Sequence, residues 1–218
     1  TSDWLQTSGV NTLRAEFETD DAGRFTHFAI RQTATDAWPT LRQHRLAVGL
    51  YSDVEGRLVR VARVETDISG ELTEVPELVG QPQPALVLLN DDDLTYAKIR
   101  LDPQSLACVV ARIGDLDSSL ARALCWSATW DMCRDAELSA ADFVTLVLAG
   151  VGVESDLTAV GAVLNQARTA IEYYAPPVTR DDLNGRFARG LARLLKEAAP
   201  GSDHQLAFAR GLITPAWP

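Results

Sequence analysis

The spacing of apolar residues changes once along this chain, near residue 100. Before that point apolar and polar residues alternate over short runs separated by turns, which is the pattern of half-buried β-strands. After it the apolar residues recur every three to four positions, as in amphipathic helices. Strands in one block and helices in another argue against an alternating βαβ sheet. We therefore expect an α+β, multidomain chain, with an N-terminal antiparallel β-sandwich followed by an all-α domain.

Seven or so strand signals fill the first part of the chain. Turns at 20–23 and 53–56 separate neighbouring runs at the spacing of hairpins. The continuous apolar run at 85–89 is typical of a strand that is buried on both faces. The expected strands cover residues 13–18, 25–34, 46–50, 58–66, 68–75, 85–89 and 96–101.

Residues that cap helices mark the starts of elements in the second part. Asp102 precedes a proline, and Ser139 stands three residues before Asp142. Thr179 stands in the same relation to Asp182, so both pairs resemble capping boxes. The short connections imply antiparallel neighbours and predict helical hairpins stacked as in a solenoid. The expected helices cover residues 103–113, 118–136, 140–150, 155–174, 180–199 and 202–211.

Charge and cysteine content exclude several classes of partner. The 218 residues include 30 Asp and Glu against 20 Lys and Arg, a net charge of -10. Such a chain repels nucleic acid and anionic membranes, so neither is an expected partner. Three cysteines are too few for a secreted disulfide scaffold and favour a reducing compartment. With no apolar run of about 18 residues and no signal-peptide pattern, the expected location is cytoplasmic.

The sequence offers no recognisable set of catalytic or metal-binding residues. His27, His44 and His204 form no His-x-x-x-His pair. Cys125 and Cys133 are eight apart on an expected helix, which separates them by about 12 Å, too far to share a zinc ion. We therefore expect no catalytic, cofactor-binding or metal-binding residue in this chain.

The most acidic segment, residues 90–93, is the next candidate for a metal site. If it were a calcium loop beginning at Asp91, Tyr96 would stand where such loops need glycine. The favoured interpretation is a turn between two strands, in which Asn and Asp side chains bond the backbone.

Aromatic pairs in the second part are expected to belong to the core. Trp126 and Trp130 are four residues apart, on one face of an expected helix. Tyr173 and Tyr174, at the end of another helix, are interpreted in the same way. At the start of the chain, residues 1–10 resemble the tail of a helix that is capped by Gly9.

Five segments resemble bacterial aminopeptidase N, of the zinc metallo-aminopeptidase family. The most specific is LNDDDLTYAKIRLD at 89–102, which resembles the end of that family's sandwich. WLQTSGVNTL at 4–13 resembles the stretch that leaves its catalytic domain, and EVPELVG at 74–80 resembles its sandwich. RALCW at 122–126 and WDMCRDAE at 130–137 resemble the first helices of its C-terminal domain. The resemblance runs from about residue 4 to at least residue 175.

The resemblance implies the non-catalytic part of such an enzyme. The family's His-Glu-x-x-His, downstream Glu and Gly-x-Met-Glu-Asn motifs are all missing, and Met132 lies in Trp-Asp-Met-Cys instead. No catalytic residue is therefore carried over, and zinc would belong to the parent enzyme's catalytic domain. The implied parts are a tail of that domain (1–12), a β-sandwich (13–101) and a truncated helical domain (102–218).

The function implied by the resemblance is an accessory one. The sandwich would support, and the helical part would enclose, the active-site chamber of an enzyme that removes N-terminal amino acids from peptides. The expected partners are the missing catalytic domain of the same chain and the peptide substrates of the parent. A helix face exposed where the chain stops could also drive self-association.

Two other functions are weighed against it. One is a free-standing module that binds a peptide or protein in a groove. The other is an unrelated hydrolase that uses His27, His44 or His204.

Overall fold

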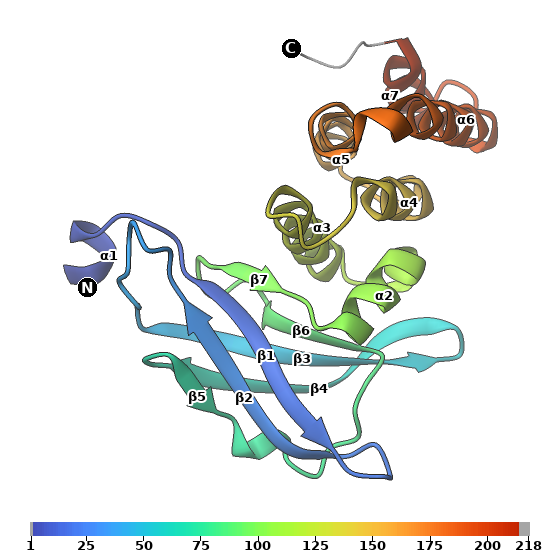
Figure 1. Cartoon of the computed structure of the whole chain (residues 1–218). Helices are drawn as coiled ribbons and strands as arrows, with labels where there is room; N and C mark the ends of the chain where they lie inside the picture. The colour runs from blue at the N-terminus through green and yellow to red at the C-terminus, as the bar shows by residue number, and fades with distance from the viewer. Residues whose placement is uncertain (1, 214–218) are drawn as a thin grey trace. The chain divides into compact units, whose positions relative to one another are not determined.

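The computed structural model describes residues 2–213, which divide into two compact units (Figure 1). The first unit comprises Thr1–Cys108 and Asp115–Ala128, and the second comprises Val109–Gly114 and Thr129–Pro218. The outermost residues of the first and last expected domains, 1 and 214–218, lie outside the described part. The α+β class expected from the sequence is confirmed, with sheets in the N-terminal half and helices after them.

The first sheet has the strand order β5-β2-β1-β7. Its long strands β1 and β2 form an antiparallel hairpin in which Ala15 pairs with Ile30. Strand β7 runs parallel to β1, whereas the β1–β2 and β2–β5 pairs of this sheet are antiparallel. The reason is that β7 follows β6 of the other sheet and crosses to the edge of β1, instead of arriving through a hairpin. The strands are β1 (Thr12–Thr19), β2 (Phe25–Thr33), β5 (Leu72–Glu74) and β7 (Lys98–Arg100).

The second sheet has the order β4-β3-β6 and is antiparallel throughout. Glu55 and Gly56 join β3 to β4 with positive φ angles of 52° and 83°, as a two-residue hairpin turn requires. Every residue of β6 is buried, which confirms the burial expected of the apolar run at 85–89. The strands are β3 (His44–Val54), β4 (Arg57–Ile68) and β6 (Leu86–Asp91).

The sandwich core combines aliphatic side chains with a small aromatic cluster. The rings of Phe17, Phe25 and Phe28 lie with centroids 5.0–5.6 Å apart. Burying side chains of this size supplies most of the driving force for folding. The fully buried aliphatic side chains include Leu13, Ile30, Leu46, Leu50, Leu58, Ile68, Leu78, Leu86 and Leu88.

Residues 103–108 and 115–128 pack with the strands, although they are helical or lie between helices. Helix α2 (Pro103–Arg112) starts at Asp102, whose Oδ1 accepts hydrogen bonds from the backbone N–H groups of Gln104 and Ser105 at 3.0 and 3.1 Å. This confirms the cap expected at Asp102. The Ser105 hydroxyl also accepts the N–H of Val87 at 2.8 Å, so it satisfies an edge position of β6. Helix α3 (Ser119–Arg134) begins in this unit.

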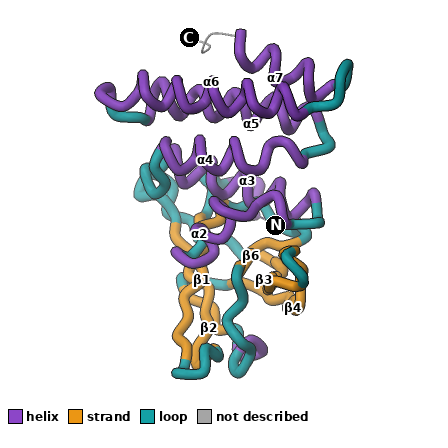
Figure 2. The backbone as a smooth tube through the Cα atoms, turned by 90° about the vertical axis from the view of Figure 1, so that its right-hand side faces the viewer, coloured by secondary structure: helices purple, strands orange, loops and turns teal. Residues whose placement is uncertain are grey.

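The second unit is built from α-helices (Figure 2). Ser139 caps α4 as expected, because its hydroxyl accepts the Asp142 N–H at 3.0 Å. The cap expected at Thr179 was wrong: its hydroxyl donates to Pro176 O at 3.0 Å, since a 3₁₀ turn at Pro177–Thr179 precedes the helix. The helices are α4 (Ala140–Gly150), α5 (Leu157–Thr169), α6 (Arg180–Glu197) and α7 (Asp203–Ile213).

Small residues set how closely these helices approach. A Cβ on Gly190 of α6 would lie 2.5 Å from Leu148 Cδ2 of α4, so a larger residue at position 190 would require the Leu148 side chain to shift. Helix α5 passes directly into a π-helical turn, Ala170–Tyr174. No helix among residues 2–213 is long and apolar enough to cross a membrane. The buried apolar side chains of this unit include Phe143, Val144, Leu146, Val147, Val160, Val163, Leu164, Ile171, Leu183, Phe187, Leu191 and Phe208.

Candidate functional site

The three histidines considered from the sequence each have separate local partners. His27 on β2 places Nε2 2.9 Å from a carboxylate oxygen of Glu74, and both side chains are partly exposed. His204 on α7 places Nε2 2.6 Å from the Glu154 carbonyl oxygen, and His44 is buried in the sandwich. Among residues 2–213 no three His, Cys, Asp or Glu side chains gather into a group able to hold a metal ion. The described side chains therefore offer no ligand set that fits zinc.

The two cysteines of α3 are buried. Burial raises the pKa of the Cys125 thiol, and it raises the pKa of Cys133 to about 11. Both therefore stay protonated near neutral pH, whereas nucleophilic and metal-binding cysteines act as thiolates. They occupy the positions of small core residues.

The acidic segment at 90–93 forms a tight turn rather than a cation loop. Asn90 directs it: its side-chain amide donates to Thr95 O at 2.8 Å, and its Oδ1 accepts the Thr95 N–H at 3.0 Å. Asn90, Asp92 and Asp93 have positive φ angles of 58°, 71° and 55°, a conformation that Asn and Asp tolerate better than most residues. The turn expected from the sequence is therefore present.

The carboxylates of this turn are engaged by arginines and a tyrosine. Asp91 accepts hydrogen bonds from Tyr51 Oη at 2.9 Å and from Arg60 Nη1 at 2.8 Å. Asp92 accepts from Arg63 Nε at 2.6 Å and from Arg60 Nη1 at 2.9 Å, and these hydrogen bonds lower its pKa. Burial, followed by the charge of Asp91, raises the pKa of Tyr51. The network ties the turn to β3 and β4, which is a structural role.

A polar network fixes the segment that leads into β1. Arg42, 3% exposed, holds this segment with its guanidinium. Its Nη2 donates to Thr7 O at 3.0 Å, to Thr7 Oγ1 at 2.8 Å and to Ser8 O at 2.8 Å. Its Nη1 lies 3.3 Å from Asn11 Oδ1, which is a further acceptor. Four acceptors around one planar group fix the direction of residues 7–11.

His44 lies at the centre of the same network. Its Nε2 is 3.0 Å from Gln32 Oε1 and 3.3 Å from Asn11 Oδ1, and its Nδ1 is 2.8 Å from Thr95 Oγ1. Burial, with a contribution from the charge of Arg42, lowers the pKa of His44 to about 4. The imidazole is therefore neutral at physiological pH and serves as a hydrogen-bonding group of the interior.

Helix α1 (Ser2–Gln6) lies against this network through one aromatic side chain. The Trp4 ring meets His44 edge-on at a centroid distance of 5.1 Å, and the Arg42 guanidinium carbon is 5.4 Å from the Trp4 centroid. Gly9 was wrongly expected to cap this helix, which ends three residues earlier. Its φ is +94°, a conformation that glycine adopts readily. A Cβ on Gly9 would lie 2.6 Å from Trp38 Cβ, so the lack of a side chain also lets the chain pass close to Trp38.

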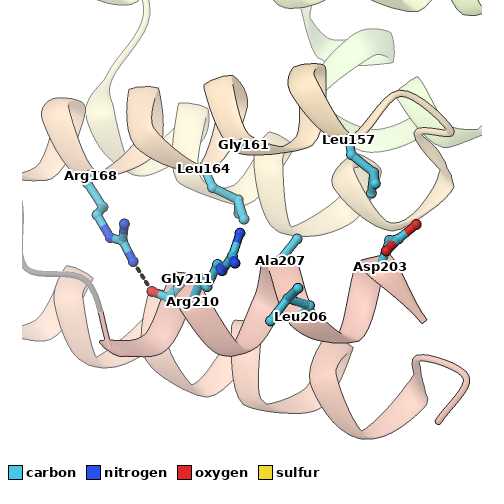
Figure 3. Close-up of a pocket in the computed structure, with 9 residues that line it drawn as sticks. All are labelled: Leu157, Gly161, Leu164, Arg168, Asp203, Leu206, Ala207, Arg210 and Gly211. Atoms are coloured by element: carbon cyan, nitrogen blue, oxygen red, sulfur yellow. Dashed lines mark hydrogen bonds between the residues drawn. The ribbon is translucent and has the colours of Figure 1, made fainter. Parts of the chain in front are cut away.

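A groove runs between α5 and α7 in the second unit (Figure 3). Its volume is about 360 Å³, and its middle is lined by Leu164, Leu206 and small residues. Arg168 lies at one end, where its guanidinium donates to Gly211 O, and Asp203 lies at the other end. Burial lowers the pKa of Arg168. Arg210 also lines the groove, on the Arg168 side. Apolar side chains between charges of opposite sign suit an amphipathic peptide segment.

The aromatic residues expected in the core of the helices divide into two groups. Trp126 is 5% exposed, as expected. Trp130 is half-buried between Phe143 and Tyr174, with centroid distances of 5.4 and 6.0 Å. Tyr173 and Tyr174 were wrongly expected to be buried: they are 54% and 43% exposed, because the π-helical turn that carries them ends the helix at the surface.

Sequence reasoning missed the network around Arg42 and His44. One signal was present in the alternation of β2, where the polar Gln32 falls at an inward-facing position. It pairs with the buried Leu13 across the β1–β2 hairpin, so the two side chains lie on the same face of the sheet. The partners of the Gln32 side chain are Gly70 and Arg42 in loops and His44 at the start of β3, and alternation within β2 does not predict where these residues lie.

Comparison with known proteins gives two matches. A family model described as the ERAP1-like C-terminal domain matches residues 86–214. A Streptomyces lividans protein described as "Aminopeptidase N" is 52% identical over 220 residues, which cover 98% of this chain and 26% of the relative. The chain thus spans about a quarter of the length of the relative that it matches.

Proposed function

Because this chain belongs to the family of ERAP1-like C-terminal domains, we propose that it is the accessory, non-catalytic part of a zinc-dependent aminopeptidase. The observation that carries the proposal is 52% identity along nearly the whole chain to about a quarter of an aminopeptidase N. The remaining polypeptide of the parent protein, meaning the longer protein to which this chain would belong, would supply the zinc site. The proposal includes a cytoplasmic location, supported by the low cysteine content.

Each part of the chain has a distinct role in this proposal. The sandwich is a rigid support. A continuous core joins its strands, and ion pairs with Arg60 and Arg63 hold the turn at residues 90–93. The helical layers enclose the chamber in which the parent removes N-terminal residues from peptides. The sequence boundaries at residues 12 and 101 remain a prediction, to be tested by limited proteolysis of the parent.

The test compares the full-length gene product with this chain alone. The parent is expected to hydrolyse an aminoacyl methylcoumarin amide and to lose that activity to a chelator. This chain alone, tested at the same molar concentration as the parent and in the presence of zinc, is expected to show no turnover. Turnover by the chain alone would overturn the accessory role, and alanine substitutions at His27, His44 and His204 would then identify the residues responsible.

The enclosing role needs its own measurement. Removing the helical part from the parent should raise cleavage of large, folded peptides relative to cleavage of a dipeptide amide, because a wall of the chamber would be gone. Circular dichroism must first show that the shortened parent folds. An unchanged ratio between the two substrates would contradict enclosure.

The apolar face of α7 also belongs to the proposal. Leu206, Leu212 and Ile213 are 49%, 38% and 80% exposed, which supports self-association of this chain or coverage by the rest of the parent. Sedimentation velocity should show a mass that rises with concentration, and less so for a Leu206→Ser, Ile213→Ser double variant. A monomer at all concentrations would contradict self-association.

A peptide-binding module remains the second candidate, because the groove between α5 and α7 has the volume and charge pattern for it. Titration of a fluorescent amphipathic helical peptide into this chain tests it. Saturable binding that is weakened by Leu206→Ser would favour the module, and no binding at millimolar peptide would exclude this groove.

A further inference from the structure

Helix α7 lines the groove of Figure 3 with a regular face. Four of its lining residues recur at positions i, i+3, i+4 and i+7, so they lie on one side of the helix. They are Asp203, Leu206, Ala207 and Arg210. Four residues at this spacing form the hole that receives a side chain when one helix packs on another. The groove side of α7 therefore has the form of a helix-packing surface.

The charges on this side of α7 make it complementary to itself. Asp203 stands in the first turn of the helix and Arg210 in the last, about 10 Å apart along the axis, and both are exposed. Leu206 and Ala207 lie midway between them. When two copies of α7 pack antiparallel about this midpoint, Asp203 of each copy faces Arg210 of the other. Parallel packing brings like charges together instead, so the charges favour the antiparallel pair.

Helix α5 fits the same twofold arrangement. Figure 3 shows Arg168 beside Gly211 at one end of the groove, and Leu157 at the end where Asp203 lies, so α5 and α7 run in the same direction. One rotation axis across the middle of the groove therefore serves both helices. It places Leu157 of one copy, which is 38% exposed, opposite Arg168 of the other, whose aliphatic stem can cover it.

Small residues leave a hollow at the centre of this arrangement. A Cβ on Gly161 of α5 would have no atom within 4 Å, and Ala207 of α7 carries only a methyl group. Leu164, 3% exposed, forms the floor of the hollow, while Leu206, 49% exposed, stands beside it. In the antiparallel pair, Leu206 of each copy can enter the hollow of the other and become buried.

We propose that the groove between α5 and α7 is a self-complementary interface, in which a second copy of this chain packs with its α7 antiparallel. The inference rests on the self-association included in the proposed function, and it deepens that proposal by naming the interface and the direction of packing. Charge selects the occupant, because a second copy supplies the opposite charge at both ends of the groove through symmetry alone.

The test uses two charge reversals in the full-length parent, Asp203→Arg and Arg210→Asp. Sedimentation velocity over a range of concentrations gives the Kd of the dimer. Either variant alone should raise this Kd by at least about tenfold, because both symmetry-related contacts then join like charges. An equimolar mixture of the two variants should dimerise again. In the mixed dimer the two introduced charges face each other, and the native Asp203 faces the native Arg210.

The mixture separates an interface effect from a folding defect, since mixing does not refold an unstable variant. Circular dichroism checks that each variant is helical. Asp181→Arg is the matched control, because Asp181 lies in the first turn of α6, is exposed and does not line the groove. This control should leave the Kd of the dimer unchanged.

Three outcomes would overturn the proposal. A parent that is monomeric at all concentrations would leave the groove to a peptide or to another part of the parent. Unchanged dimerisation of both variants would place the contact on another surface. Failure of the mixture to dimerise would contradict the antiparallel pairing. Aminopeptidase turnover is scored separately: an active monomer refutes only this interface, whereas an inactive parent that dimerises as expected refutes only the enzyme role.

Discussion

Gly49 and Asp91 occupy adjoining positions on β3 and β6 that leave no room for a larger residue at 49. A Cβ on Gly49 would lie 2.8 Å from Asp91 Cγ and 2.9 Å from Tyr51 Cε2. Because Asp91 is also bonded to Tyr51 and Arg60, it cannot move without breaking those hydrogen bonds. We expect Gly49→Ala to lower the free energy of unfolding by about 1–3 kcal/mol, measured by urea denaturation.

Gly161 provides the control for that substitution. It lies in α5 with no atom within 4 Å of an added Cβ. Gly161→Ala should stabilise the helical unit by about 0.5–1 kcal/mol, because alanine has the higher helix propensity. Equal destabilisation by both substitutions would show that the contact with Asp91 is not the cause.

Trp126 should be one of the main contributors to stability on α3. It is 5% exposed, and removing a buried ring of that size leaves a cavity. Trp126→Ala is expected to cost about 3–5 kcal/mol in denaturant melts followed by circular dichroism. Leu120→Ala on the same helix, where the side chain is 42% exposed, should cost less than about 1 kcal/mol. Similar losses for the two would mean that the buried face of α3 is wrongly assigned.

Stability should fall in acid because of His44. Burial lowers its pKa from 6.5 to about 4, so between these values the unfolded chain binds a proton that the folded chain does not. The stabilisation is complete above pH 6.5 and is lost as the pH falls to about 4, by up to about 3 kcal/mol. Urea melts from pH 7 to pH 4 measure this loss.

His44→Gln supplies the comparison for the acid dependence. Glutamine keeps hydrogen-bonding capacity but does not titrate, so the part of the pH slope due to His44 should disappear. The carboxylates contribute their own acid dependence in both proteins. Identical slopes for the two would contradict a role for His44.

Thiol chemistry should report on the burial of Cys125 and Cys133. Burial raises the pKa of Cys133 to about 11 and raises that of Cys125 as well, so few thiolates form at pH 8. Reaction of Cys125 and Cys133 with Ellman's reagent should therefore be slow in the folded chain and complete in guanidinium chloride, with mass spectrometry distinguishing them from the half-buried Cys108. Rapid modification of Cys125 without denaturant would contradict its burial.

The elements of this fold were predictable because their signals are local. The alternation of 13–18 gave β1, the fully apolar 85–89 gave β6, and the capping residues Asp102 and Ser139 marked two helix starts. The incorrect interpretations share one cause. Whether Thr179 caps a helix, or Tyr173 is buried, depends on how the neighbouring turn bends, which is set by packing and not by spacing along the sequence.

The sequence by itself determined the spacing of apolar residues in each segment, and hence that strands precede helices. It also determined that this chain contains no zinc-protease motif. Both depend only on neighbouring residues. The tertiary structure alone decided that β7 pairs parallel to β1 and that Arg42, His44, Gln32 and Asn11 meet in one buried network. The four residues of the network are up to 33 positions apart along the chain, and Thr12 of β1 pairs with Lys98 of β7, 86 positions away. A polar side chain acquires its partners only when loops and strands close around it.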